Sequence, residues 1–311
     1  MLSRHFLRAK AMQTLFGHVV SQETNPRRAV QQLELRIDRL NNLGLYQLAL
    51  LDEATHIASR VNEDAQRKFN PSEEERDPSQ RLVENAFIAQ VCQNRELRKH
   101  WEHLGVNWAL QVSDFRRFYL RFRDTDLYRE YAKAPYINYE ADKQMAIDLF
   151  RAIVNDEALR QALLNHDLLW EDDYDQIAQY NFMMLKELDA TFDEDSHFPL
   201  MSDPNNMKDT EDLRFATQLV ANTLEAWDDN EQRIRRRLDK WELERIPTLD
   251  TVILNMAITE FKTCASIPSA VTMNEYVELA KEYSVTDSKS KAFVNGILNK
   301  IEEDMRNDGT L

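Results

Sequence analysis

The fold class of this chain is clearest in residues 267–301, which read IPSAVTMNEYVELAKEYSVTDSKSKAFVNGILNKI. Thr272 and Glu275 stand three residues apart, the spacing of a capping box, so a helix is predicted to begin here. A second helical pattern starts near Ser290, after a short polar link. The apolar residues of the two patterns recur every three or four positions: Tyr276, Leu279, Ala280, Tyr283, Phe293, Val294, Ile297, Leu298 and Ile301. The stretch therefore predicts two amphipathic helices, each with an apolar face turned to a core.

Helical spacing extends over most of the remaining chain. The expected helices cover residues 4–20, a long segment from about 26 to 57 that is bent or interrupted at Gly44, and residues 80–100, 106–132, 140–165, 173–190, 213–227 and 248–264. Residues 193–206 hold two prolines and form the clearest linker. The chain has only five Gly and eight Pro, which leaves few residues for the tight turns of a many-stranded sandwich or barrel. The predicted fold class is all-α.

The composition is that of a globular protein without membrane segments. Of the 311 residues, 43% are hydrophobic and 30% are charged, which is richer in core-forming side chains than a disordered chain. The longest apolar stretch, residues 43–51, is far shorter than the roughly 20 residues of a membrane span. The N-terminus lacks the apolar run of a signal peptide. Cys92 and Cys264 form no disulfide framework. We therefore expect a cytoplasmic protein that does not bind membranes.

Motifs for catalysis, cofactors and metals are missing from the sequence. No Gly-rich phosphate-binding loop and no G-x-S-x-G motif occurs. The seven His are scattered, and His100 and His103 share a helix face without a third zinc ligand nearby. The sequence therefore predicts no catalytic residues, no cofactor and no metal site.

The charge of the chain is divided unevenly. Thirty-nine basic and 54 acidic side chains give a net charge of −15, which alone would disfavour a nucleic-acid partner. Residues 23–210 account for −12 and residues 211–311 for −6, whereas residues 1–22 carry +3 and no acid. The basic groups of this N-terminal helix, with a nearby histidine, are Arg4, His5, Arg8 and Lys10. Positive charge near a helix N-terminus is unfavourable, so the cluster is either a phosphate-binding surface or an ordinary solvated face.

A second candidate lies in residues 285–293, VTDSKSKAF. Free amides at a helix N-terminus and nearby lysines suit a phosphate, and an aromatic ring can stack on an unpaired base. The alternative is a segment that only caps the helix, with its lysines in solvent and its ring in the core. The candidate residues are Asp287, Ser288, Lys289, Lys291 and Phe293.

These residues carry a family resemblance. Residues 267–301 resemble the C-terminal signature of the NusB family of bacterial transcription antitermination factors, which reads close to I-P-x-x-V-x-I-N-E-x-V-E-L-A-K-x-[FY], a short polar link, and K-x-F-V-N-G-[IV]-L. The matching residues are Pro268, Val271, Asn274, Glu275, Glu278, Leu279, Ala280, Lys281, Phe293, Val294, Asn295, Gly296 and Leu298. Residues 244–261 resemble the preceding family helix, and residues 9–16, AKAMQTLF, resemble the first one.

The resemblance implies two helical sub-bundles and no enzymatic activity. It also implies binding of a single-stranded, boxA-like RNA element in ribosomal RNA transcripts, together with the ribosomal protein that doubles as NusE, in an antitermination complex on RNA polymerase. The family's RNA surface includes the basic first helix and the link before the F-V-N-G helix. By position these are the two candidate segments already identified.

Three departures from the family pattern matter. Phe6 and Leu7 dilute the basic start, which favours weaker or partner-dependent RNA binding. The link before Phe293 is one or two residues longer than usual, so the roles of Asp287 and Ser288 are less defined. Most of the middle has no family counterpart. We therefore expect a first helix in residues 1–22, an acidic helical insertion in residues 23–205, and the remainder of the family domain in residues 206–311.

Two other functions stay open. One is a helical protein-interaction module whose acidic insertion docks on a partner, with no direct RNA contact. The other is enzymatic, because a similar domain precedes some ribosomal RNA cytosine methyltransferases. No cofactor-binding sheet is predicted in this chain, so methyl transfer is not expected.

Overall fold

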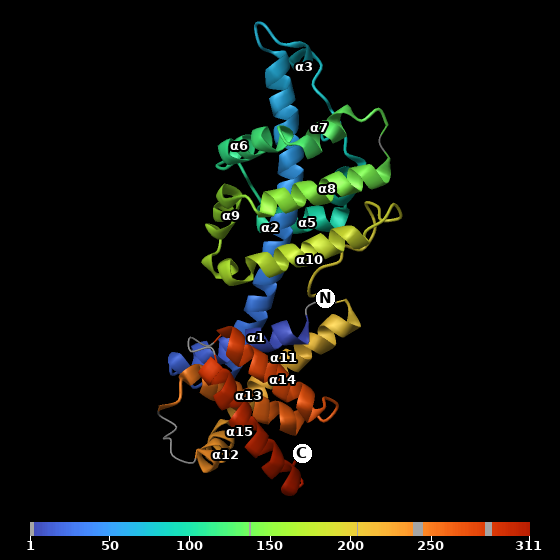
Figure 1. Cartoon of the computed structure of the whole chain (residues 1–311). Coiled ribbons are helices and arrows are strands. Elements are labelled where there is room, and N and C mark those ends of the chain that lie inside the picture. The colour runs from blue at the N-terminus through green and yellow to red at the C-terminus, as the bar shows by residue number, and fades with distance from the viewer. Residues whose placement is uncertain (1–2, 137, 204, 239–244, 284–287) are drawn as a thin grey trace. The chain divides into compact units, whose positions relative to one another are not determined.

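The computed structural model describes residues 3–136, 138–203, 205–238, 245–283 and 288–311. Within these ranges the chain forms fifteen α-helices and one 3₁₀ helix, and no strand (Figure 1). The predicted all-α class is confirmed. None of the helices in the described ranges has the length and apolar character needed to cross a membrane.

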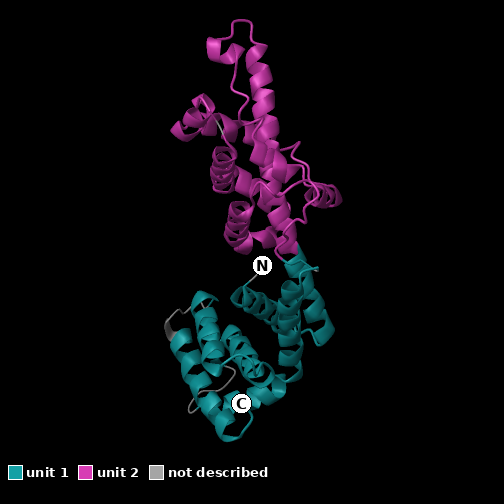
Figure 2. Ribbon diagram, turned by 90° about the vertical axis from the view of Figure 1, so that its right-hand side faces the viewer, with its two compact units in different colours: residues 1–38, 202–311 teal, residues 39–201 magenta. Residues whose placement is uncertain are grey.

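The chain divides into two compact units, coloured separately in Figure 2. Unit 1 comprises Met1–Asp38 and Ser202–Leu311, and unit 2 comprises Arg39–Met201. Helix α2, Pro26–Gln66, contributes to both. The other helices of unit 1 are α1 Arg4–Val20, α11 Met207–Glu225, α12 Trp227–Arg237, α13 Thr248–Thr263, α14 Ser269–Tyr283 and α15 Ser288–Asn307. Those of unit 2 are α3 Glu73–Arg76, α4 Ala86–Cys92, α5 Arg95–Leu104, α6 Val112–Arg123, α7 Asp126–Lys133, α8 Tyr139–Val154, α9 Glu157–Leu164, η1 Leu168–Asp173 and α10 Tyr174–Glu187.

Helix α13 is the centre of unit 1. Every residue from Asp250 to Phe261 is buried, because α1, α11, α12, α14 and α15 all pack against this helix. Such a helix is apolar nearly all round rather than on one stripe. Its few polar side chains are therefore held inside the bundle, where they need partners.

Helix α1 begins at a well-formed cap. The hydroxyl of Ser3 accepts a hydrogen bond from the backbone amide of Phe6 at 3.2 Å, which satisfies one free donor of the first turn. One face of the helix, including Leu7, Met12 and Leu15, is buried in the core of unit 1. The first turns of α2 belong to the same core: Ala29, Leu33 and Ile37 are buried there.

Helix α2 continues through Gly44. Of the bend or interruption predicted at this residue, the interruption is wrong. The reason lies in unit 2. The Cε atom of Met201 would lie 3.0 Å from a Cβ atom at position 44, and the side-chain amide of Asn181 donates to the Gly44 carbonyl at 3.0 Å. Gly44 thus allows close packing against the helix rather than a break in it.

The expected single helix over residues 80–100 is divided into α4 and α5. Asn85 caps α4 by accepting from the Ile88 amide at 2.8 Å, and Asn94 caps α5 by accepting from the Leu97 amide at 3.0 Å. Two asparagine caps nine residues apart explain the division, because this side chain favours the N-cap position over the helix interior.

Candidate nucleic-acid interface

Arg4 lies on the surface of unit 1, beside α11. Its Nε donates to Oδ1 of Asp212 at 2.9 Å, and its side chain is 46% exposed. Its guanidinium carbon lies 5.1 Å from the ring centroid of Phe215. The guanidinium is therefore accessible to solvent, but it already forms an ion pair with Asp212.

His5 lies between two carboxylates of α14. Its Nδ1 is 2.8 Å from Oε2 of Glu275, and its Nε2 is 3.2 Å from Oε2 of Glu282. Burial of the ring would lower the pKa of His5, but the hydrogen bonds and charges of the two glutamates outweigh it and raise the pKa above the ordinary value. The ring thus links the start of α1 to α14.

Arg8 points into unit 1. The side chain is only 3% exposed, and it donates from Nε to Oε2 of Glu260 at 2.8 Å and from Nη2 to Oε1 at 2.7 Å. Glu260 also accepts from the hydroxyls of Thr272 and Tyr276, both at 2.9 Å. The Glu260 carboxylate thus accepts four hydrogen bonds. A buried ion pair requires its oxygen atoms to be hydrogen-bonded in this way.

Lys10 is also buried, at 2% exposure. Its Nζ donates to Oε1 of Gln13 at 2.9 Å and lies 5.1 Å from the ring centroid of Phe6. Of the four predicted residues on α1, Arg4 and His5 therefore reach the surface, whereas Arg8 and Lys10 face the interior.

The second predicted segment is only partly described. Asp287 lies outside the described residues, and Ser288 and Lys289 open α15. Farther along the helix, Nζ of Lys291 lies 3.4 Å from Oε1 of Glu278, and the partly buried ring of Phe293 packs against the core of unit 1. A lysine at the surface and a partly buried ring on the same helix are compatible with both a phosphate-binding segment and a segment that only caps the helix.

Helix α14 connects the two predicted segments. Glu275 and Glu282 contact His5 of α1, and Glu278 contacts Lys291 of α15 as well as Lys281 of its own helix at 3.0 Å. Hydrogen bonds from Lys281, and then from Lys291, lower the pKa of Glu278. Both segments thus belong to unit 1. Glutamates of α14 pair with His5 of the first segment and with Lys291 of the second.

Sequence reasoning missed the anchors of this surface. Ser290 is buried and donates its hydroxyl to the Asp250 carboxylate, with both oxygens at 2.5 Å. Burial raises the pKa of Asp250, although the Ser290 hydrogen bond opposes the shift. A signal for such anchors was present, because Asp250 and Glu260 are the acids of a run in α13, residues 250–261, that is otherwise uncharged and mostly apolar. A charge in such a run predicts a buried partner.

The described residues include no group of three or more His, Cys, Asp or Glu side chains placed to hold a metal ion. What the geometry offers instead is a set of surface cations and an aromatic ring on two helices. That chemistry suits phosphate contacts and base stacking rather than bond making.

Unit 1 is thus an all-helical bundle built around one fully buried helix, with the ends of its first and last helices tied to that bundle by charged and polar pairs. The chain belongs to the NusB family. The NusB family model matches residues 175–303, a range that begins in α10 and does not include α1.

Three relatives are named Transcription antitermination protein NusB. The one from Geobacillus kaustophilus is 41% identical over 88 residues, 28% of this chain and 66% of the relative. The one from Thermodesulfovibrio yellowstonii is 43% identical over 90 residues, which is 29% of this chain and 58% of the relative. The one from Bacillus cereus strain B4264 is 36% identical over 106 residues, 34% and 80%. The chain therefore spans less than two thirds of the length of the first two relatives. No solved structure gives a significant match.

Proposed function

We propose that this protein is an RNA-binding transcription antitermination factor. It binds a single-stranded, boxA-like element of ribosomal RNA transcripts together with ribosomal protein NusE, within an antitermination complex on RNA polymerase in the cytoplasm, and it catalyses no reaction. The observation that carries the proposal is the identity of 36% to 43% with proteins named for transcription antitermination.

The proposed RNA surface flanks α14. Arg4 and His5 supply positive charge from α1, Lys291 supplies it from α15, and the half-exposed ring of Phe293 offers a stacking face. Asp287, Ser288 and Lys289 are included in the proposal from the sequence pattern alone. Arg8 and Lys10 act there as positioning residues, because their buried side chains hold α1 against the bundle.

The surface is largely neutralised in the free protein. Arg4 pairs with Asp212, His5 with Glu275 and Glu282, and Lys291 with Glu278. RNA phosphates must replace these carboxylates, so each contact contributes less than an unpaired cation would. This favours modest affinity for RNA alone and a need for a partner protein.

The partner surface that we propose lies farther along α1. Phe16 and Val20 are one helical turn apart and are 37% and 59% exposed. An exposed pair of apolar side chains on an ordered helix suits a protein partner better than an RNA backbone. We assign this pair to the contact with NusE.

The test is a gel-shift assay of the full chain with boxA-like RNA, with and without NusE, over a salt series. We expect binding that NusE strengthens and salt weakens, because phosphate contacts release counterions. Absence of a shifted band at low salt with NusE present would contradict the proposal. A scrambled RNA of equal length is the control for sequence preference.

We also propose that the insertion lies in unit 2, residues 39–201, close to the range 23–205 expected from the sequence; the family match overlaps this unit from residue 175 onward. Unit 2 holds 19 basic and 30 acidic side chains, an excess that favours the second candidate function, a protein-docking module. That function requires a stable protein complex that persists when Arg4 and Lys291 are both replaced by Glu. Loss of the complex in this double variant would favour the RNA-dependent function.

A further inference from the structure

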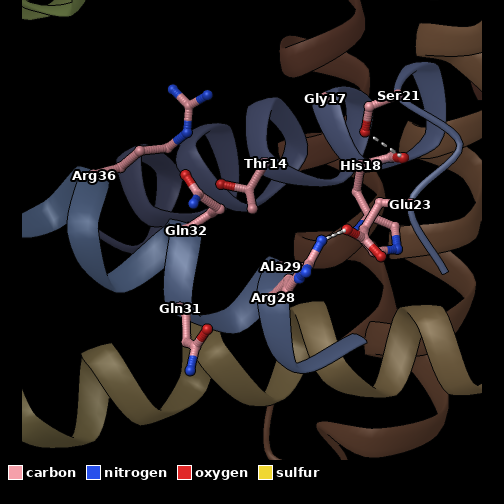
Figure 3. Close-up of a pocket in the computed structure, with 10 residues that line it drawn as sticks. All are labelled: Thr14, Gly17, His18, Ser21, Glu23, Arg28, Ala29, Gln31, Gln32 and Arg36. Atoms are coloured by element: carbon pink, nitrogen blue, oxygen red, sulfur yellow. Dashed lines mark hydrogen bonds and ion pairs between the residues drawn. The ribbon is translucent and has the colours of Figure 1, made fainter. Parts of the chain in front are cut away.

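A cavity of about 500 Å³ lies in unit 1, where the C-terminal half of α1 faces the first turns of α2 (Figure 3). Its walls include Thr14, Gly17 and His18 from α1, and Gln32 and Arg36 from α2. It lies at the opposite end of α1 from Arg4 and His5. The cavity is therefore separate from the proposed RNA surface.

The cavity carries a net positive charge. Two arginines and one glutamate line it, and Nη1 of Arg28 donates to Oε2 of Glu23 at 2.5 Å. Glu23 also accepts from the backbone amides of Thr24 and Asn25 at 2.9 and 3.0 Å. Glu23 thus pairs with Arg28 and two backbone amides, and no ion pair between Glu23 and Arg36 is formed among the described residues.

Arg36 is left without a counter-ion. Among the described residues, its Nε has no hydrogen-bond partner and is shielded from solvent, while the side chain as a whole is partly buried. Other buried side-chain atoms without partners in this part of the chain belong to neutral residues. A shielded, charged donor with no acceptor is unfavourable, and an anion bound at the guanidinium would supply the acceptor.

One neutral side chain of the cavity, that of Gln32, also suits an anion. Figure 3 shows the side chains of Thr14 and Gln32 directed toward one another across the space between α1 and α2. The Thr14 hydroxyl donates to the Lys10 carbonyl at 2.8 Å, whereas the Gln32 amide can supply two donors. Arg36 and Gln32 are four residues apart and so share one helix face.

A phosphate group fits these donors best. A guanidinium forms paired hydrogen bonds with phosphate, and the remaining phosphate oxygens can accept from the Gln32 amide. A volume of about 500 Å³ also falls within the range of small-ligand sites, so it leaves room for a group of nucleotide size.

We propose that this cavity binds a phosphate group, free or carried by a small molecule of mononucleotide size, with Arg36 as its principal ligand and Gln32 as a second donor. His18 can add a donor from α1 through a ring N–H. The site operates independently of the RNA surface.

The test is isothermal titration of the full chain with inorganic phosphate, AMP and adenosine. We expect binding of phosphate or AMP and none of adenosine. Arg36→Gln should weaken binding at least about tenfold, since it removes a charged hydrogen bond. Arg27→Gln is the matched control, because Arg27 is exposed on the same helix and does not line the cavity. Tighter binding of AMP than of phosphate would identify a nucleotide site, and equal binding a free-phosphate site.

A second variant blocks the cavity without touching its charges. A Cβ atom at Gly17 would meet no atom within 4 Å, so Gly17→Leu should fill space and abolish binding while Gly17→Ala retains it. Thermal melts check that both variants fold. The proposal fails if neither phosphate nor AMP binds, if adenosine binds as well as AMP, if acetate competes as well as phosphate, or if Arg36→Gln binds like the parent chain.

Discussion

Arg8 and Glu260 form a bidentate ion pair inside unit 1, although 252 positions separate them in the sequence. Through this pair α1 is tied to α13, and through Thr272 and Tyr276 the same carboxylate is tied to α14. The position of the first helix, and with it that of Arg4 and His5, therefore depends in part on this buried carboxylate.

We expect Arg8→Met to destabilise unit 1 by about 3–5 kcal/mol, because it leaves Glu260 buried without its counter-ion. The measurement is the free energy of unfolding from urea titration. Arg306→Met is the control, since Arg306 pairs with Glu302 one turn away on α15 at the surface; we expect a cost below about 1 kcal/mol. Equal costs for the two variants would refute a buried role for Arg8.

His5 makes the stability of unit 1 depend on pH. Its folded pKa is raised above the ordinary value of 6.5, so its contribution is fully present below about pH 6 and is lost as the pH rises through the folded pKa. We expect His5→Gln to lower the free energy of unfolding at pH 5.5 and to have a smaller effect at pH 8.5. The ring is one-third exposed, so the difference should stay below about 1 kcal/mol. A larger loss at the higher pH would reverse the assigned sign.

Glu278→Gln should strengthen RNA binding. The change frees Lys291 and Lys281 from their carboxylate partner, and we expect a gain of about three- to tenfold at low salt that disappears at high salt. Glu303→Gln is the matched control, since Glu303 is exposed on α15 and the substitution changes the net charge equally. RNA affinity is measured by filter binding. An equal gain in affinity for Glu278→Gln and Glu303→Gln would mean that overall charge alone is responsible. No binding by any variant would instead count against the proposed function.

Ser290→Ala tests the anchor of α15. Removing the hydroxyl leaves the Asp250 carboxylate buried without its donor, which should cost about 1–3 kcal/mol at pH 7. The Ser290 hydrogen bond lowers a pKa that burial raises, so its loss raises the folded pKa further. The cost should therefore shrink as the pH falls and Asp250 becomes protonated. Urea titrations at pH 7 and pH 4 measure this difference, and an equal cost at both values would exclude a charged Asp250.

Helix periodicity, caps and the scarcity of glycine were sufficient to predict the all-α class. They could not show which cations of α1 face inward, because a helix with Arg4, His5, Arg8 and Lys10 can be turned several ways against a core. The orientation is set by Glu260, a residue too distant in sequence for local spacing to reveal. The continuity of α2 was hidden for a similar reason, since it depends on the packing of Met201 and Asn181 around Gly44.

The complete burial of α13 has a consequence for how this chain can change in evolution. A helix with no solvent side from Asp250 to Phe261 has no position where a substitution is merely superficial, so new properties must arise elsewhere. Unit 2 is joined to unit 1 after Asp38 and before Ser202. An insertion at this place does not change any helix that packs against α13. The bundle could therefore gain an additional unit of more than a hundred residues without replacing a single side chain at its centre.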